Sequence, residues 1–145
     1  MCIRDSAIRE MLAEAENERM HLMFFIAIAK PNLFERFLVV LAQLIFMSFY
    51  FVLYMISFQT AHRMVGYFED EAVRSYTDYL DLIYKGDIED IFAPNLAVSY
   101  YGLDPGAKLS DMITCVRDDE MKHAKVNHRY ADKAKEIKTW RIAKR

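Results

Sequence analysis

The chain has little of the residues that build turns, loops and disulfide frameworks. It contains only 4 glycines, 3 prolines and 2 cysteines in 145 residues. So few turn-forming residues argue against an architecture of many short strands and favour long helices. The two cysteines, Cys2 and Cys115, form no C-x-x-C pair and cannot make up a disulfide framework.

The chain also has little net charge, −2 at pH 7, which neither favours nor excludes an acidic or a basic partner. Its end is basic, and we expect residues 137–145 to be a solvated tail or, alternatively, a contact with a membrane surface or a phosphate. We expect no nucleic-acid partner. Apolar residues are plentiful at 54%, and the length is enough for one domain with one core. This composition predicts an all-α protein with wide apolar faces.

Apolar positions at helical spacing and clear stop signals predict the helices. We expect four long ones, at residues 7–30, 33–58, 60–84 and about 110–136. Pro31 cannot continue the first helix, and Gly86 follows the third at the position where glycine often ends a helix. Residues 87–106 are predicted to be a connector with one short helix after Pro94.

One segment has no charged side chain at all, from Phe37 to Phe58. A helix of about 20 apolar residues is long enough to cross a bilayer. The segment also contains Gln43, Ser48 and three tyrosine or serine positions that interrupt its apolar surface. Two interpretations stay open: the helix spans the membrane, or it lies along the membrane with one face in lipid.

The chain carries the motif E-x-x-H twice, as ENERMHL at residues 16–22 and RDDEMKH at residues 117–123. Residues three apart lie on one face of a helix, so such a glutamate and histidine can bind the same metal ion. Di-iron carboxylate bundles take one E-x-x-H from each of two helices and one glutamate from each of two others. With only 4 histidines in the chain, the repeated motif predicts a di-iron site.

The template also requires one glutamate from a third helix, and we predict that this ligand is Glu69 rather than Glu71. His62, Glu69 and Tyr76 follow one another at intervals of seven residues, two helical turns, and therefore form one stripe. No glutamate on a fourth helix is available, so the chain offers five of the six ligands of the template. We expect His128 to face away from the ligands and the thiol of Cys115 to be buried.

Three segments together resemble one family: ENERMHL (16–22), HRMVGYFEDEAVRSYTDYL (62–80) and RDDEMKHAKVNH (117–128). They resemble the alternative oxidases, which are cyanide-insensitive ubiquinol oxidases. The resemblance covers about residues 8–132 and implies a ferritin-like di-iron helical bundle, bound to one membrane leaflet as a homodimer. It implies an enzyme that oxidises ubiquinol and reduces dioxygen to water without pumping protons. The implied location is the mitochondrial inner membrane, on the matrix side, or a bacterial inner membrane.

The resemblance also implies roles for individual residues. Two non-haem iron ions would be bound by Glu18, His21, Glu69, Glu120 and His123. Three residues would hold these ligands in place: Asn17, His62 and Asp119. Tyr76 matches the catalytic tyrosine that exchanges electrons with the irons, and Ser75 matches a hydroxyl position near the quinol. Tyr101, in the segment YYGL, lies next to a position often filled by tryptophan.

Two long helices of the family, one with an L-E-T glutamate as the sixth ligand, have no counterpart here. We therefore predict an N-terminally truncated fragment, an incomplete bundle. Residues 1–6 would be a non-native leader, residues 7–136 a partial di-iron domain, and residues 137–145 the basic tail. Two other functions stay open: a different ferritin-like di-iron protein, such as an iron store or peroxidase, and an inactive, truncated, membrane-associated helical protein.

Overall fold

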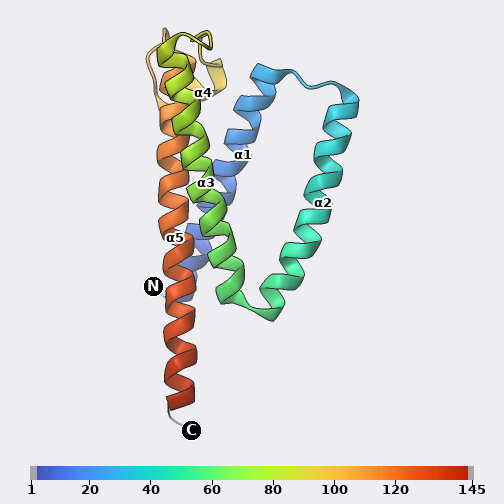
Figure 1. Ribbon diagram of the computed structural model, residues 1–145, viewed down its shortest axis with the longest axis vertical. Helices are drawn as coiled ribbons and strands as arrows, with labels where there is room; N and C mark the ends of the chain where they lie inside the picture. The colour runs from blue at the N-terminus through green and yellow to red at the C-terminus, as the bar shows by residue number, and fades with distance from the viewer. Residues whose placement is uncertain (1–2, 144–145) are drawn as a thin grey trace. The chain divides into compact units, whose positions relative to one another are not determined.

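The computed structural model describes the backbone of residues 3–143 and the side chains of residues 6–136. This part of the chain forms five helices: α1 (Ile3–Ala29), α2 (Leu33–Ile56), α3 (Phe58–Lys85), α4 (Asn95–Tyr101) and α5 (Leu109–Ala143) (Figure 1). Within that range, β pairing is limited to an isolated antiparallel bridge between Phe92 and Lys108. The predicted all-α class is confirmed, and the short helix after Pro94 is α4.

The helix ends differ from the prediction at both ends of the chain. Helix α1 begins at Ile3, inside the predicted leader, whose first two residues lie outside the described part. Helix α5 continues through the predicted tail as far as Ala143, and the side chains of that tail also lie outside the described part. Cys115, for which we expected burial, is half-buried.

The chain divides into two compact units. We define unit 1 as residues 1–31 with 80–116, which hold α1, the end of α3, α4 and the start of α5. Unit 2 is residues 32–79 with 117–145, which hold α2, most of α3 and the rest of α5. Each E-x-x-H motif lies within one unit: the first in unit 1 and the second in unit 2.

Helix α2 starts in a capping box. The side chain of Asn32 accepts hydrogen bonds from the backbone N–H groups of Phe34 and Glu35, at 2.9 and 3.0 Å. The Glu35 carboxylate accepts in return from the backbone N–H of Asn32, at 2.8 Å. These bonds satisfy N–H groups that a helix start otherwise leaves unpaired, which fixes the start of α2 directly after Pro31.

A single residue, Ser57, separates α2 from α3. The sequence predicted this boundary two residues later, with one helix ending at Phe58 and the next beginning at Thr60. Ser57 adopts an extended conformation, with φ −153° and ψ 95°, and its N–H ends α2 by donating to the carbonyl of Leu53 at 2.8 Å. Its hydroxyl oxygen accepts from the N–H of Thr60 at 3.2 Å and so caps the next helix. One serine therefore ends one helix and begins another.

No residue of α2 is buried. Among the described residues, Leu33–Ile56 is the one helix that is long and apolar enough to cross a membrane, judged by length and composition. Its large apolar side chains are exposed along its whole length, with Ile45 at 63% and Met55 at 71%. This surface fits both interpretations of the uncharged segment, a span and a helix lying in one leaflet.

The large apolar side chains of the core lie in unit 1. Its fully buried large side chains are Phe24 of α1 and Met112, Ile113 and Val116 of α5. The connector before α5 is tied down by backbone bonds, from Ala93 N–H to the Ala107 carbonyl at 3.0 Å and from Leu109 N–H to the Ile91 carbonyl at 2.8 Å. The segment predicted as a connector is therefore an ordered part of the unit.

In unit 2, α3 and α5 run antiparallel side by side (Figure 1). The contacts that join them are Phe58 with Tyr130, His62 with Asn127, Arg63 with Asp132, and Asp70 with His128. The buried apolar residues of this pair are alanines, Ala61, Ala124 and Ala131, and the other buried side chains are polar. Small residues let the helix backbones approach closely and leave the space between them to polar side chains.

His128 packs against α3 at Gly66. Its Nε2 lies 2.9 Å from an Asp70 carboxylate oxygen, and its Nδ1 lies 2.9 Å from an Arg63 guanidinium nitrogen. A Cβ atom added at Gly66 would lie 2.6 Å from the His128 ring. The histidine that we expected to face away from the ligands thus has its own partners, and the glycine makes room for its ring.

We expect Gly66→Ala to lower the free energy of unfolding by about 1–3 kcal/mol, the usual cost of overpacking a tight contact. The added methyl group would push away a ring that two polar partners hold in place. Gly106→Ala is the matched control, because nothing lies within 4 Å of a Cβ at Gly106. Chemical denaturation of both variants measures the effect, and equal stability of the two would show that His128 does not fill this space.

Candidate metal centre

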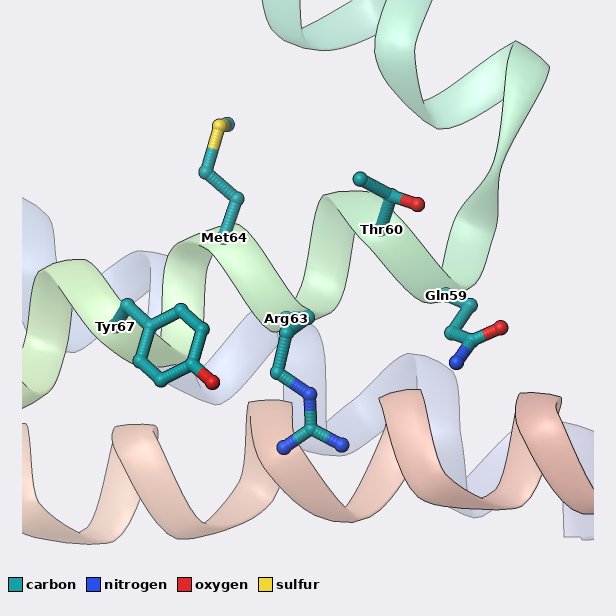
Figure 2. A pocket seen from close by; sticks show the side chains of 5 residues that line it. All are labelled: Gln59, Thr60, Arg63, Met64 and Tyr67. Carbon is teal, nitrogen blue, oxygen red and sulfur yellow. The ribbon is translucent and has the colours of Figure 1, made fainter.

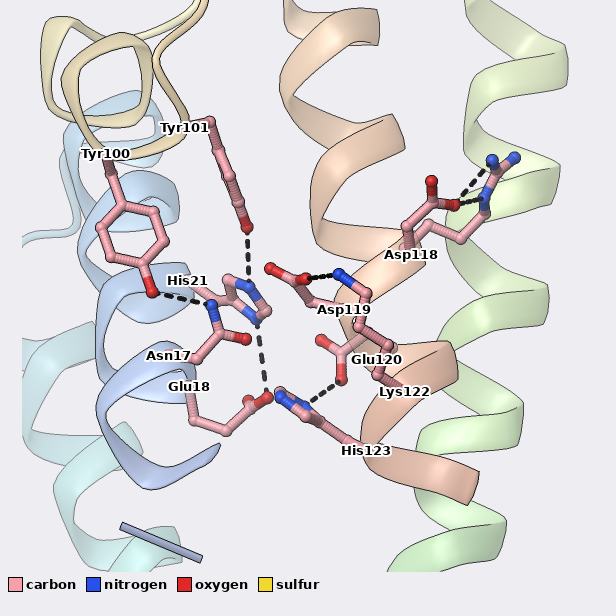
Figure 3. Close-up of polar contacts among 11 residues, drawn as sticks. Asn17, Glu18, His21, Tyr100, Tyr101, Asp118, Asp119, Glu120, Lys122 and His123 are labelled. Carbon is pink, nitrogen blue, oxygen red and sulfur yellow. Dashed lines mark hydrogen bonds and ion pairs between the residues drawn. The ribbon is translucent and has the colours of Figure 1, made fainter. Parts of the chain in front are cut away.

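Both E-x-x-H motifs have the same internal geometry. His21 Nδ1 lies 3.6 Å from Glu18 Oε1 in α1, and His123 Nδ1 lies 3.7 Å from Glu120 Oε2 in α5 (Figure 3). These separations are longer than an N–H···O hydrogen bond, which spans about 2.7–3.2 Å. Two ligands that each bind one ion at about 2 Å lie roughly 3 Å apart or slightly more. Each pair therefore has a spacing suited to sharing a metal ion.

Unit 2 brings three of the predicted ligands together. Ligand atoms of Glu69, Glu120 and His123 lie within 4.8 Å of one another. Glu120 and His123 are only 3% and 8% exposed, and Glu69 is half-buried. Burying carboxylates is costly unless they are paired or bind a metal. A carboxylate and imidazole group of this kind is a candidate metal site.

The position of Glu71 supports the choice of Glu69 as the ligand. Glu71 is exposed and pairs with Arg74, one turn further along α3. Glu69 instead is half-buried and belongs to the group with Glu120 and His123.

In unit 1, two neighbouring tyrosines of α4 reach the first motif (Figure 3). The hydroxyl of Tyr101 lies 3.0 Å from His21 Nε2, and the side-chain amide of Asn17 donates to the hydroxyl of Tyr100 at 3.0 Å. These contacts could not be predicted from the sequence, because Tyr101 lies 80 residues from His21 along the chain and the spacing of residues along one helix does not reveal such a contact.

His62 was predicted to hold ligands in place, and it is linked to the second motif through Asn127. Asn127 donates from its side-chain nitrogen to the backbone carbonyl of His123 at 3.1 Å. Its side-chain oxygen therefore faces His62 Nδ1, at 2.7 Å, and accepts the proton of that nitrogen. Asn127 was missed, although its position four residues after His123, on the same face of α5, was a usable signal.

His62 is buried among aromatic rings. The ring centroids of Phe58, Tyr130 and Tyr54 lie 4.3, 5.3 and 5.8 Å from that of His62. Its Nε2 is buried and has no hydrogen-bond partner among the described residues. Burial lowers the pKa of His62, and the hydrogen bond with Asn127 offsets part of this effect. His62 is therefore a neutral histidine at neutral pH.

The other predicted site residues lie in different surroundings. Asp119 is half-buried and accepts an ion-pair hydrogen bond from Lys122 at 2.7 Å. Tyr76 is half-buried on α3, and Ser75 beside it is exposed. The roles assigned to these three residues rest on the resemblance and stay predictions.

A surface cavity of about 390 Å³ opens on α3, lined by Gln59, Thr60, Arg63, Met64 and Tyr67 (Figure 2). None of the predicted ligands lines it. Arg63 extends from it to Asp132 of α5. The cavity is thus separate from the group of candidate ligands.

Comparison with known proteins places the chain in one family. Residues 1–132 match the sequence profile described as "Alternative oxidase". The chain is 48% identical over 124 residues to "Ubiquinol oxidase 1, mitochondrial" of Glycine max, covering 86% of this chain and 39% of that protein. It is 50% identical over 125 residues to "Ubiquinol oxidase 1a, mitochondrial" of Arabidopsis thaliana, covering 86% of this chain and 35% of that protein.

A fungal protein shows the same relation. The chain is 47% identical over 126 residues to "Ubiquinol oxidase, mitochondrial" of Batrachochytrium dendrobatidis, covering 87% of this chain and 40% of that protein. The chain thus spans about two fifths of the length of the curated relatives it matches.

The lowered pKa of His62 makes folding depend on pH. Between that pKa and the value of 6.5 for an unperturbed histidine, the unfolded chain binds more protons than the folded chain. The contribution of His62 to stability is therefore present above pH 6.5 and is lost as the pH falls toward the lowered pKa. We expect the free energy of unfolding to fall less steeply with decreasing pH in His62→Gln than in the unmodified chain. Denaturant titrations at several pH values measure both slopes, and identical slopes would contradict a buried neutral His62.

Proposed function

This chain belongs to the alternative oxidase family, and we propose on that basis that it is part of a ubiquinol oxidase. The enzyme would oxidise ubiquinol and reduce dioxygen to water at a centre of two non-haem iron ions. The observation that carries the proposal is the group of Glu69, Glu120 and His123 on α3 and α5, of which Glu120 and His123 are buried. It is supported by the first E-x-x-H, on α1, which has the same internal geometry as the second, on α5.

The chemistry of the donors fits iron. Carboxylate oxygens and neutral imidazole nitrogens are the ligands of non-haem iron in di-iron bundles. We propose the five ligands that the family resemblance implies: Glu18, His21, Glu69, Glu120 and His123. The sixth ligand of the template, a glutamate on another helix, has no counterpart among the residues that the resemblance matches.

When bound, iron would supply the transfer of electrons to dioxygen. Reduction of one dioxygen to two water molecules takes four electrons and four protons, so two ubiquinol molecules are oxidised for each dioxygen. The protein would hold the ions by its carboxylates and histidines. The burial of Glu120 and His123 keeps bulk water from these ligands. His62 and Asn127 would keep the α5 motif in position through the His123 backbone carbonyl.

We propose that Tyr76 is the residue that exchanges electrons between ubiquinol and the irons, as the resemblance implies. Its place on α3, two helical turns after Glu69 on the same face, supports this role. The exposed hydroxyl of Ser75, the residue before it, would contact the quinol head group.

The apolar surface of α2, a helix with no buried residue, supports membrane association. We propose that α2 lies in one leaflet of the membrane, where a lipid-soluble quinol is available, and that the protein is a homodimer. The relatives named above are mitochondrial by name, which supports a mitochondrial over a bacterial location. The inner membrane and its matrix side are proposed because the resemblance implies them.

The alternative of an iron store or a peroxidase is not favoured. The profile that matches is that of the oxidases, and the relatives named above are ubiquinol oxidases by name. An inactive helical protein is distinguished from an iron protein by the metal-binding measurement that follows.

We expect the chain to bind iron(II) under anaerobic conditions, and we expect Glu69→Gln to weaken that binding at least tenfold, about 1.4 kcal/mol. The substitution keeps the shape of the side chain but removes the negative charge that binds the ion. Glu71→Gln is the matched control two residues away, because Glu71 is exposed and pairs with Arg74. Competition with a chelator measures the affinities. Equal effects of the two substitutions would exclude Glu69 as a ligand, and a folded, unmodified chain that binds no iron would favour the inactive protein.

We expect Tyr76→Phe to lower cyanide-insensitive oxygen uptake with ubiquinol at least tenfold while the iron content stays unchanged. Loss of the phenol removes the group that exchanges electrons but no metal ligand. Tyr84→Phe, which removes the hydroxyl of a tyrosine that is 69% exposed, serves as the control. Oxygen uptake by membranes that contain the protein is the measurement, and full activity of Tyr76→Phe would rule out the proposed role.

A further inference from the structure

We propose that Tyr101 is a positioning residue that fixes the tautomer and the orientation of His21. Its hydroxyl oxygen would accept a hydrogen bond from the Nε2–H of His21, which leaves the lone pair of Nδ1 facing Glu18, where the metal ion would bind. The metal-binding part of this inference rests on the proposed function, whereas the tautomer is a property of the protein without metal.

The two nitrogens of the His21 ring face different groups. Nε2 lies 3.0 Å from the Tyr101 hydroxyl, a hydrogen-bond distance, and Nδ1 lies 3.6 Å from Glu18 Oε1, which is too long for a hydrogen bond (Figure 3). A neutral imidazole carries one N–H, so a ring that binds metal through Nδ1 must carry its proton on Nε2. The Tyr101 oxygen lies where it can accept that N–H.

The position of Tyr101 is set by packing. The centroid of the Tyr101 ring lies 5.6 Å from that of Phe24, which is fully buried, and 5.0 Å from that of Tyr100. Helix α4 ends directly after Tyr101, at Gly102, whose left-handed conformation (φ +65°) suits glycine. The hydroxyl is therefore held in place before any metal binds.

His21 has few ways to reorient, because its side chain is only 4% exposed. Partners of this kind, which bind the second nitrogen of a ligand histidine, orient its ring and set its tautomer. A tyrosine hydroxyl can either donate or accept, and its acceptor role at Nε2 is the one that leaves Nδ1 as the ligand atom. The inference therefore makes a definite statement about which nitrogen carries the proton.

Tyr100 provides a matched control. It precedes Tyr101 on the same helix, and its hydroxyl accepts from the Asn17 side-chain amide at 3.0 Å, one turn before His21 on α1. Its ring also packs against Phe24, with 5.7 Å between the two ring centroids. Tyr100→Phe thus removes one hydroxyl from the same helix and the same aromatic cluster, but not the one that faces His21.

The experiment is a long-range ¹H–¹⁵N correlation spectrum of the histidine side chains in the metal-free chain. We expect His21 to carry its proton on Nε2 in the unmodified chain and in Tyr100→Phe, and to populate the Nδ1–H form in Tyr101→Phe. Chelator competition on the same samples should show iron(II) binding weakened about 10–100-fold in Tyr101→Phe.

Three results would overturn the inference: a proton on Nδ1 of His21 in the unmodified chain, an unchanged tautomer in Tyr101→Phe, or a change of tautomer that Tyr100→Phe produces equally. If Tyr101→Phe does not fold, the spectrum of the unmodified chain alone still decides, because the inference requires Nε2–H there. Failure of the unmodified chain to bind iron, with the Nε2–H tautomer present, would contradict the proposed function and leave the positioning of His21 by Tyr101 intact.

Discussion

A buried glutamate beside a buried histidine is the constraint on which much of unit 2 depends. Glu120 and His123 face each other at 3.7 Å, too far apart for a hydrogen bond, and both are almost fully removed from water. Such a pair is costly to bury unless a shared cation or further polar partners compensate it. The other buried residues of the antiparallel pair of α3 and α5 are alanines and polar residues, among them Asn127, which bonds to the backbone carbonyl of His123. The arrangement serves a binding site better than it serves an ordinary apolar core.

The two motifs are supported in different ways. In unit 2, the support is a chain of hydrogen bonds inside one helix pair, from His62 through Asn127 to the backbone of His123. In unit 1, the support comes from α4, a helix of seven residues whose tyrosines reach across to α1. Ligands placed on regular helices and held by partners from a neighbouring element are the general design of a preorganised site. The bulky apolar core lies in unit 1, around Phe24, and it is this packing that holds α4 and its tyrosines in place.

Local sequence signals predicted the long helices and the short helix after Pro94, because each depends on spacing within one element. The boundary between α2 and α3 was predicted two residues too late, at Gln59 instead of Ser57, since one capping serine within a long apolar stretch does not disturb the helical pattern around it. The bond of Asn127 with His62 and that of Tyr101 with His21 were not predicted for a different reason. The partners in these bonds lie 65 and 80 residues apart along the chain, and only the folded arrangement of the helices brings them together. The roles of Tyr76 and Ser75 came from the resemblance alone, and no contact within one helix could have supplied them.

The central claim is that both E-x-x-H motifs contribute ligands to one di-iron centre. The most direct test is an anomalous difference map at the iron absorption edge, from crystals of the iron-loaded protein. We expect two neighbouring iron peaks, with His21 and Glu18 among the ligands on one side and His123 and Glu120 among those on the other. A single iron bound by one motif only, or iron at neither motif, would contradict the claim and with it the proposed reduction of dioxygen at this site.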